Sequence, residues 1–281
     1  MFSQVAAVVF LSLLLLAPLS AAALALVRAR FTPLQGLLYL LAVALVKVRW
    51  RASWEGALPL TDGQGAVIVL NHRSSVDPFF VQTTTLRKIR WLVAREYCEH
   101  PAFAWFLRAC EVIPVGRGGV DTAATKAALR TVESGGLVGM FPEGRINMTG
   151  ELMLPGRPGA ALVALKARVP LLPVYIAGSP YDRFAWSPFF LTVRVSVRFG
   201  GAIDLAEYYG REDEPGVVDE IMLRCLREIA RLAERPDHEP QLAGRHWKPT
   251  AEELAAATET GRNGPGNAKS SQQRGPSSPP A

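Results

Sequence analysis

The stretch Ala66–Asp77, AVIVLNHRSSVD, decides the fold of this chain. Its first five residues are all apolar and follow the turn signal Asp62-Gly63, so they predict a short buried strand, 66–70. The remainder, from Asn71 onward, is mostly polar. Polar side chains directly after a buried strand lie where α/β proteins bind their ligands. The stretch therefore predicts an α/β fold with a candidate site at the carboxyl end of a strand.

Strand and helix patterns alternate through the rest of the chain. Leu137–Phe141 and Leu171–Ile176 predict buried strands, whereas Leu191–Phe199 alternates apolar and polar residues and predicts a half-exposed strand near an edge. Between and after them lie helical patterns at Pro78–Leu86, Pro101–Ala109, Asp121–Glu133, Pro158–Ala167 and Val217–Leu232, the last an amphipathic packing helix with a solvated basic face. This alternation predicts a mostly parallel sheet flanked by helices.

The chain is both basic and apolar. It carries 31 Lys and Arg against 25 Asp and Glu, a net charge of +6, and 49% hydrophobic residues. The apolar excess is concentrated at the start, where residues 1–27 contain no charge and Val5–Val27 is long enough to cross a bilayer. A second uncharged run spans Phe31–Val46. Basic residues flank these runs: Arg28, Arg30, Lys47, Arg49 and Arg51.

We expect the two apolar runs to form a membrane-associated helical hairpin: one span or deep insertion, then a re-entrant or interfacial helix. The basic residues form two clusters, Arg28 with Arg30 and Lys47 with Arg49 and Arg51. In this arrangement both clusters face the cytoplasm and its anionic lipids. A signal peptide would carry a basic segment before Arg28, and none exists, although Ala21–Ala23 resembles a cleavage site. Two full spans would place the basic clusters on opposite sides of the membrane. The 16 residues of the second run are also short for a span.

These patterns divide the chain into three parts. Residues 1–52 hold the membrane-associated helices, residues 53–250 the α/β domain, and residues 251–281 a C-terminal segment. From about residue 261 the sequence is rich in Gly, Pro, Ser and Gln, which predicts disorder. Cys98, Cys110 and Cys225 exclude a disulfide scaffold and suit a reducing cytoplasm. The cysteines and histidines outside Ala66–Asp77 lack metal-ligand spacing, so we expect no metal.

His72 and Asp77 are the first candidates for chemistry. If a helix begins near Ser74 or Ser75, Asp77 lies in its first turn and can fold back onto His72. A carboxylate on Nδ1 fixes the imidazole tautomer and leaves Nε2 free as a base. The competing interpretation is a Ser/Asp helix cap beside an incidental histidine. We expect both serines to act as caps rather than nucleophiles, and no G-x-S-x-G elbow is present.

Two further clusters could bind a phosphate or hydroxyl group. Glu143, Gly144 and Arg145 directly follow the apolar stretch ending at Phe141. A carboxylate and a guanidinium beside a glycine suit that role, but they would equally fit a structural ion pair in a turn. Arg117 lies in the loop V-G-R-G-G, which could hold a phosphate or be an ordinary surface loop, and which lacks the Lys of a Walker loop.

Together these clusters resemble the glycerolipid acyltransferases, the PlsC-like 1-acylglycerol-3-phosphate acyltransferase family. The resemblance covers roughly residues 56–201 and rests on four blocks in order: N-H-x4-D at 71–77, an apolar stretch ending in Arg at 112–117, F-P-E-G at 141–144, and V-P-x-x-P-V at 169–174. Members usually read F-P-E-G-[ST]-R, whereas Arg145 here follows Gly144 directly. Either Arg145 binds the phosphate from one position earlier, or Arg157 does.

The resemblance implies acyl transfer from a thioester, acyl-CoA or acyl carrier protein, to the sn-2 hydroxyl of lysophosphatidic acid, without a cofactor. His72 would act as general base oriented by Asp77. Arginines 117 and 145 would clamp the phosphate, and Glu143 would bind a glycerol hydroxyl or brace them. The resemblance also implies substrate-binding roles for Asn71, Gly144 and Arg157.

Two alternatives to this function stay open at the level of sequence. One is an acyltransferase for another lyso-lipid, such as lyso-ornithine lipid, and the other is a non-catalytic membrane-binding protein of the same fold. A nucleic-acid binder is disfavoured because the positive charge is dispersed. The expected location is the bacterial inner membrane, with the catalytic domain on the cytoplasmic side.

Overall fold

The computed structural model describes residue 10 and residues 20–21, 24–116, 121–180 and 186–244. At its centre is a seven-stranded sheet in the order β1-β7-β6-β2-β5-β3-β4, in which every pairing is parallel except the antiparallel pair β6–β7. The strands are β1 Ser53–Glu55, β2 Ala66–Leu70, β3 Ile89–Ala94, β4 Ile113–Val115, β5 Leu137–Met140, β6 Leu171–Ala177 and β7 Ser196–Phe199. This is the mostly parallel α/β fold expected from the sequence.

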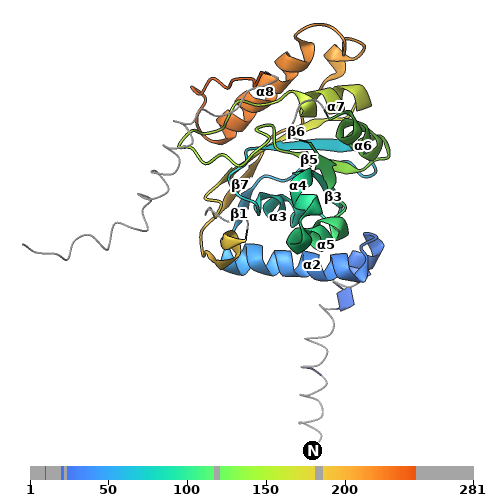
Figure 1. The fold of residues 1–281 in the computed structure, drawn as a ribbon, viewed down its shortest axis with the longest axis vertical. Coiled ribbons are helices and arrows are strands. Elements are labelled where there is room, and N and C mark those ends of the chain that lie inside the picture. Colours follow the sequence, from blue (N-terminus) through green and yellow to red (C-terminus); the bar gives the residue numbers. More distant parts are fainter. Residues whose placement is uncertain (1–9, 11–19, 22–23, 117–120, 181–185, 245–281) are drawn as a thin grey trace, which may run out of the picture.

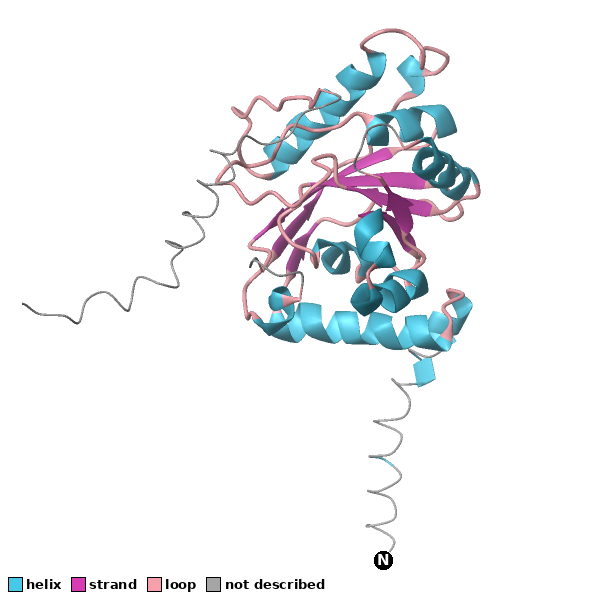
Figure 2. Cartoon of the chain, viewed as in Figure 1, coloured by secondary structure: helices cyan, strands magenta, loops and turns pink. Residues whose placement is uncertain are grey.

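Helices cover both faces of the sheet (Figures 1 and 2), with α6 to α8 on one face and α2 to α5 on the other. The helices are α2 Pro33–Ala44, α3 Asp77–Gln82, α4 Arg95–Glu99, α5 Pro101–Ala109, α6 Thr122–Glu133, α7 Gly159–Ala167 and α8 Val217–Leu232, with short helices η1 Leu45–Arg49, η2 Ser187–Phe190 and η3 Ala206–Tyr208.

The central strand β2 contributes to both hydrophobic cores. Val67 and Val69 pack in the core under α6 to α8, while Ile68 and Leu70 pack in the core that also contains Phe80 of α3. Successive side chains of a strand point to opposite faces of the sheet, so a fully apolar strand is buried on both sides. Burying both faces fixes β2 firmly, and this rigid strand carries the polar stretch that follows it.

The helix α2 lies along the outside of the second helical layer (Figure 1). It begins at Pro33 after a capping box between Thr32 and Gln35, and it continues as the π-helix η1. Leu34, Leu37 and Leu41 are exposed on it. Among the described residues, no helix combines the length and apolar content needed to cross a bilayer.

Several predictions from the sequence fall outside the described residues. The first apolar run lies largely outside them, so the helical hairpin stays a prediction. The C-terminal segment and Arg117 also lie outside the described residues. The disorder of that segment and the three-part division of the chain stay predictions.

The structure corrects three predicted elements. The predicted strand Leu191–Phe199 is shortened to β7, because the pairings of β6 and β1 with this segment begin only at Ser196. Its predicted place near an edge of the sheet is confirmed, because β7 lies next to the edge strand β1. The predicted helix 78–86 ends at Gln82, where a run of threonines turns. Finally, neither serine caps α3, because its N-cap is Val76 and forms no side-chain cap.

Candidate active site

The site lies at the carboxyl ends of three neighbouring strands. Asn71 and His72 follow β2, and Phe141 follows β5, which pairs with β2 in parallel. The Asn71 side chain donates to the carbonyl of Ile176 in β6 at 2.9 Å and accepts from the amide of the same residue at 2.8 Å. Asn71 is almost fully buried, so it joins two strand ends at the base of the site rather than facing a ligand.

The imidazole of His72 is paired with the carboxylate of Asp77. Nδ1 of His72 lies 3.0 Å from Oδ2 of Asp77. The carboxylate can only accept, so Nδ1 carries the proton in this pair and Nε2 is left as the basic nitrogen. His72 lines a large cavity of about 1870 Å³. The pair therefore has the arrangement of a general base with its orienting carboxylate.

Asp77 is held by four donors. Its Oδ2 also accepts from the amides of Arg73 at 2.7 Å and Ser74 at 2.8 Å, while Oδ1 accepts from Oγ of Ser179 at 2.6 Å. The residue is 0% exposed. The loop between β2 and α3 thus wraps around the carboxylate, which explains why Asp77 reaches back to a histidine five residues earlier.

Aromatic rings fix the plane of the imidazole. Phe141 stacks on His72 with ring centroids 3.7 Å apart, and Trp91 of β3 stacks on Phe141 at 5.3 Å. Trp91 lies over Gly139 of β5, where an added Cβ would come within 2.3 Å of the indole. A side chain at position 139 would therefore displace the ring that supports Phe141. The signal for this in the sequence is a glycine within an otherwise apolar strand.

Glu143 binds backbone. It is 1% exposed, and its two oxygens accept from the amides of His72 at 2.7 Å and Leu154 at 2.8 Å. Burial raises the pKa of Glu143 to about 8, outweighing the two amides, which favour the carboxylate. The residue joins the catalytic turn to the loop after β5, a role that local sequence does not reveal because Leu154 is eleven residues away.

Two arginines line the same cavity. Gly144, at φ +66°, turns the chain after Glu143, and Arg145 and Arg157 both border the cavity. The side chain of Arg157 passes close to Gly144, with Nε 3.4 Å from where a Cβ would lie, and its amide donates to the carbonyl of Pro142 at 2.8 Å. The structure thus brings both alternative phosphate ligands to one wall, whereas Arg117 lies outside the described residues.

The rest of the cavity wall is largely apolar and comes from the helical layer below the sheet. Helix α2 contributes Leu38, η1 contributes Leu45, α5 contributes Phe106, and η2 contributes Phe189. Such a wall suits a hydrocarbon chain, since apolar surface gains free energy when water is displaced from it. The cavity therefore combines a base, two arginines on one wall and an apolar surface.

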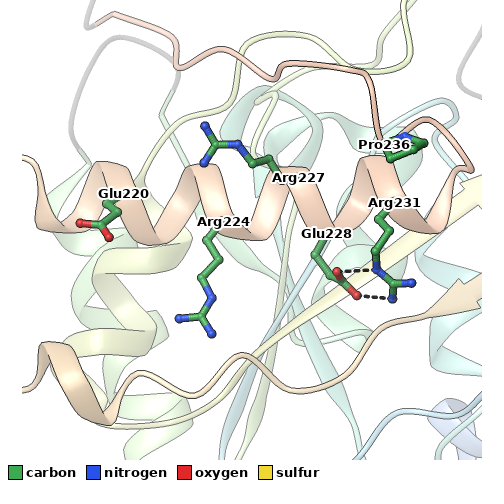
Figure 3. Close-up of a pocket in the computed structure, with 6 residues that line it drawn as sticks. All are labelled: Glu220, Arg224, Arg227, Glu228, Arg231 and Pro236. Carbon is green, nitrogen blue, oxygen red and sulfur yellow. Dashed lines mark hydrogen bonds and ion pairs between the residues drawn. The ribbon is translucent and has the colours of Figure 1, made fainter.

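A second hollow lies along the exposed face of α8 (Figure 3), and its lining includes none of the four sequence blocks. Its arginines are paired with carboxylates: Arg224 with Glu207 at 3.0 Å, and Arg231 with Glu228 at 2.6 Å. Exposed pairs of this kind leave little net charge to attract a ligand. This supports the prediction of a solvated face, and we locate the chemistry in the cavity at His72.

Comparisons with known proteins find acyltransferases. The acyltransferase family model matches residues 51–177. A 1-acyl-sn-glycerol-3-phosphate acyltransferase of Streptococcus pneumoniae is 26% identical over 211 residues, 74% of this chain and 74% of that protein. One from Helicobacter pylori is 27% identical over 120 residues, 42% of this chain and 51% of that protein.

A solved structure extends the likeness to the fold. The crystal structure of the acyltransferase PlsC from Thermotoga maritima superposes with a TM-score of 0.52 at 19% identity, over 76% of this chain and 88% of that chain. The residues matched by the family model include His72, Asp77 and Glu143. Residues 51–177 therefore form a domain of the acyltransferase family that resembles PlsC, and the protein is an O-acyltransferase.

Proposed function

We propose that this enzyme transfers an acyl group from an acyl thioester to the sn-2 hydroxyl of lysophosphatidic acid, giving phosphatidic acid. The observation that carries the proposal is the His72–Asp77 pair on a cavity that also holds Arg145 and Arg157. The two relatives named above are 1-acyl-sn-glycerol-3-phosphate acyltransferases, which supports the same acceptor.

The proposed reaction needs no covalent enzyme intermediate. Nε2 of His72 takes the proton of the acceptor hydroxyl while its oxygen attacks the thioester carbonyl. Asp77 stabilises the imidazolium that forms. The tetrahedral intermediate then expels the thiolate, which receives the proton from His72, so an ester and a free thiol are the products. Positioning of the two substrates supplies the remaining acceleration.

Glu143 acts in this proposal as a positioning residue. Its oxygens are used by the amides of His72 and Leu154, so it fixes the backbone from which the imidazole projects. Arg145 and Arg157 then bind the acceptor phosphate, since guanidinium groups pair strongly with phosphate oxygens.

We further propose that the enzyme works at the membrane. The exposed leucines of α2 and the basic residues at its two ends, Arg30 and Lys47 among them, suit an interfacial helix on an anionic bilayer. The proposed acceptor, lysophosphatidic acid, is a lipid that a bilayer supplies directly.

The acceptor and donor are tested by a panel. The purified enzyme is assayed with lysophosphatidic acid, lysophosphatidylcholine and lyso-ornithine lipid, each with acyl-CoA and with acyl carrier protein. We expect the highest kcat/KM with lysophosphatidic acid, because its phosphate monoester offers the most charge to the arginines. A preference for lyso-ornithine lipid, which lacks phosphate, would show that the proposed acceptor is wrong and that the proposed acyl transfer is right. Binding of lipids without any acyl transfer would contradict the enzymatic proposal.

The arginines are tested by Arg145→Ala and Arg157→Ala. A charge-assisted contact to phosphate is worth roughly 1.5–3 kcal/mol, so KM for lysophosphatidic acid should rise by about ten- to a hundredfold while KM for the thioester changes little. The matched control is Arg224→Ala on the face of α8 shown in Figure 3. If neither variant changes the acceptor KM, the phosphate is bound elsewhere.

A further inference from the structure

We propose that Trp186 and η2, which together we call the aromatic corner (residues 186–190), form a second membrane contact beside α2, inserted into the interface of a bilayer with anionic headgroups. The inference rests on the proposed membrane location. It adds a contact that is about 140 residues from the N-terminal helices in sequence.

The aromatic corner presents two large apolar side chains to solvent. Phe190 is 75% exposed and Trp186 is 62% exposed. The neighbouring Val48 of η1 is 76% exposed. An isolated exposed apolar residue is ordinary, but large exposed aromatic rings grouped beside another apolar surface indicate an interaction site.

Three contacts fix the aromatic corner to the end of the α2–η1 helix. The guanidinium of Arg49 donates to the carbonyl of Phe190. The indole of Trp50 donates to the carbonyl of Pro188 at 3.0 Å, and its ring lies 5.8 Å from that of Phe189. Figure 1 shows η2 beside the C-terminal end of α2, so the exposed rings extend the apolar surface that α2 begins.

The chemistry around the aromatic corner favours a bilayer over a protein partner. Lys47 and Arg51 are exposed on either side of Val48 and Arg49. Tryptophan with flanking basic residues is the composition of a membrane interface, where the ring sits at the headgroups and the cations meet lipid phosphates. The exposed residues also continue directly into the leucines of α2, so one bilayer surface could contact both.

The proposed position would also explain how lipids reach the site. Pro188 and Phe189 line the catalytic cavity together with Leu41 and Leu45 of the α2–η1 helix. The same two elements therefore border the cavity on their inner sides and expose apolar groups on their outer sides. Docking through both would bring the hydrocarbon region to the rim of the cavity.

The experiment uses the full chain in vesicles of phosphatidylcholine and phosphatidylglycerol. Cys98 and Cys110 are replaced by alanine, and Cys225 is kept because it is fully buried and out of reach of the label. One accessible cysteine carrying a polarity-sensitive fluorophore is then placed by Phe190→Cys, Leu37→Cys or Arg227→Cys. Position 37 reports α2, and position 227 lies on the exposed face of α8, on the other side of the sheet (Figures 1 and 3). Quenching by lipids spin-labelled on the acyl chain shows which positions enter the bilayer.

We expect quenching at 37 and 190 and none at 227. Quenching at 37 alone would overturn the inference while leaving the membrane proposal intact, and quenching at neither would overturn both. If the emission of a fluorophore at position 190 is blue-shifted but not quenched, the aromatic corner contacts a protein partner, such as a second copy. That result would also overturn the inference. In addition, Trp186→Ser with Phe190→Ser should lower the rate on vesicle-embedded acceptor by about tenfold, because the variant loses two rings that bind at the interface. In detergent micelles the change should be smaller than twofold.

Discussion

His72→Ala is expected to lower kcat/KM by about 10²–10⁴-fold, the usual contribution of a positioned general base. The fold should survive, because within the part of the chain that the structure describes the imidazole makes one side-chain hydrogen bond, to Asp77, and stacks on Phe141 at the border of a cavity. The measurement is a steady-state assay of thiol release with lysophosphatidic acid and acyl thioester, alongside circular dichroism to confirm folding.

The space left by the imidazole allows a sharper test. Free imidazole added to His72→Ala should restore part of the activity, because Asp77 stays fixed by its other donors, the amides of Arg73 and Ser74 and the hydroxyl of Ser179. His238→Ala, a histidine outside the cavity, is the matched control. Ser74→Ala, assayed side by side, separates the mechanisms: full activity in His72→Ala would contradict the general-base role, and a trapped acyl-serine at position 74 would replace direct transfer by a covalent route.

The pair His72–Asp77 could be predicted from sequence because both residues lie in one loop. The strand β2 and the helices α5 and α8 occupy the predicted ranges Ala66–Leu70, Pro101–Ala109 and Val217–Leu232. Their patterns are decided locally, by an unbroken apolar run or by helical spacing with a proline at the start. The catalytic pair and these elements could therefore be predicted, because the residues that determine them are neighbours both in sequence and in space.

The partners that hold the pair could not be predicted in this way. Ser179 comes from the end of β6 and Trp91 from β3, and both reach the site only because the sheet order places these strands near β2. The strand β3 itself was missed, since it carries the exposed Arg90 and owes its extended form to pairing with β5 and β4. Tertiary pairing decides such elements, and a single sequence does not display it.

The sequence identifies Glu143 as part of a motif but does not determine its role. The sequence marks it beside Gly144 and Arg145, which suggests a group facing the ligand. The structure instead uses both of its oxygens for the amides of His72 and Leu154. A buried carboxylate that joins two backbone segments controls the geometry of the catalytic turn without touching substrate. Substituting Glu143 should therefore lower kcat and the free energy of unfolding together.

Glu143→Gln is expected to lower kcat by about ten- to a hundredfold and to destabilise the fold, because an amide supplies one acceptor oxygen where two amide donors require two. The unsatisfied, buried N–H group costs roughly 1–3 kcal/mol. KM for both substrates should change less than kcat, since the carboxylate is almost fully buried and both of its oxygens accept from backbone amides. Steady-state kinetics and chemical denaturation measure the two effects, with the exposed Glu133→Gln as the matched control.

The pH dependence of the free energy of unfolding tests the carboxyl group of Glu143 directly. Its pKa is raised from 4.5 to about 8 by folding, so the folded protein binds a proton there that the unfolded chain has lost. The contribution of Glu143 is therefore fully present below pH 4.5 and is lost as pH rises through about 8. Glu143→Gln cannot titrate, so its free energy of unfolding should fall less than that of the wild type across this window. Parallel pH profiles combined with an unchanged kcat would contradict both the protonation and the positioning role of Glu143.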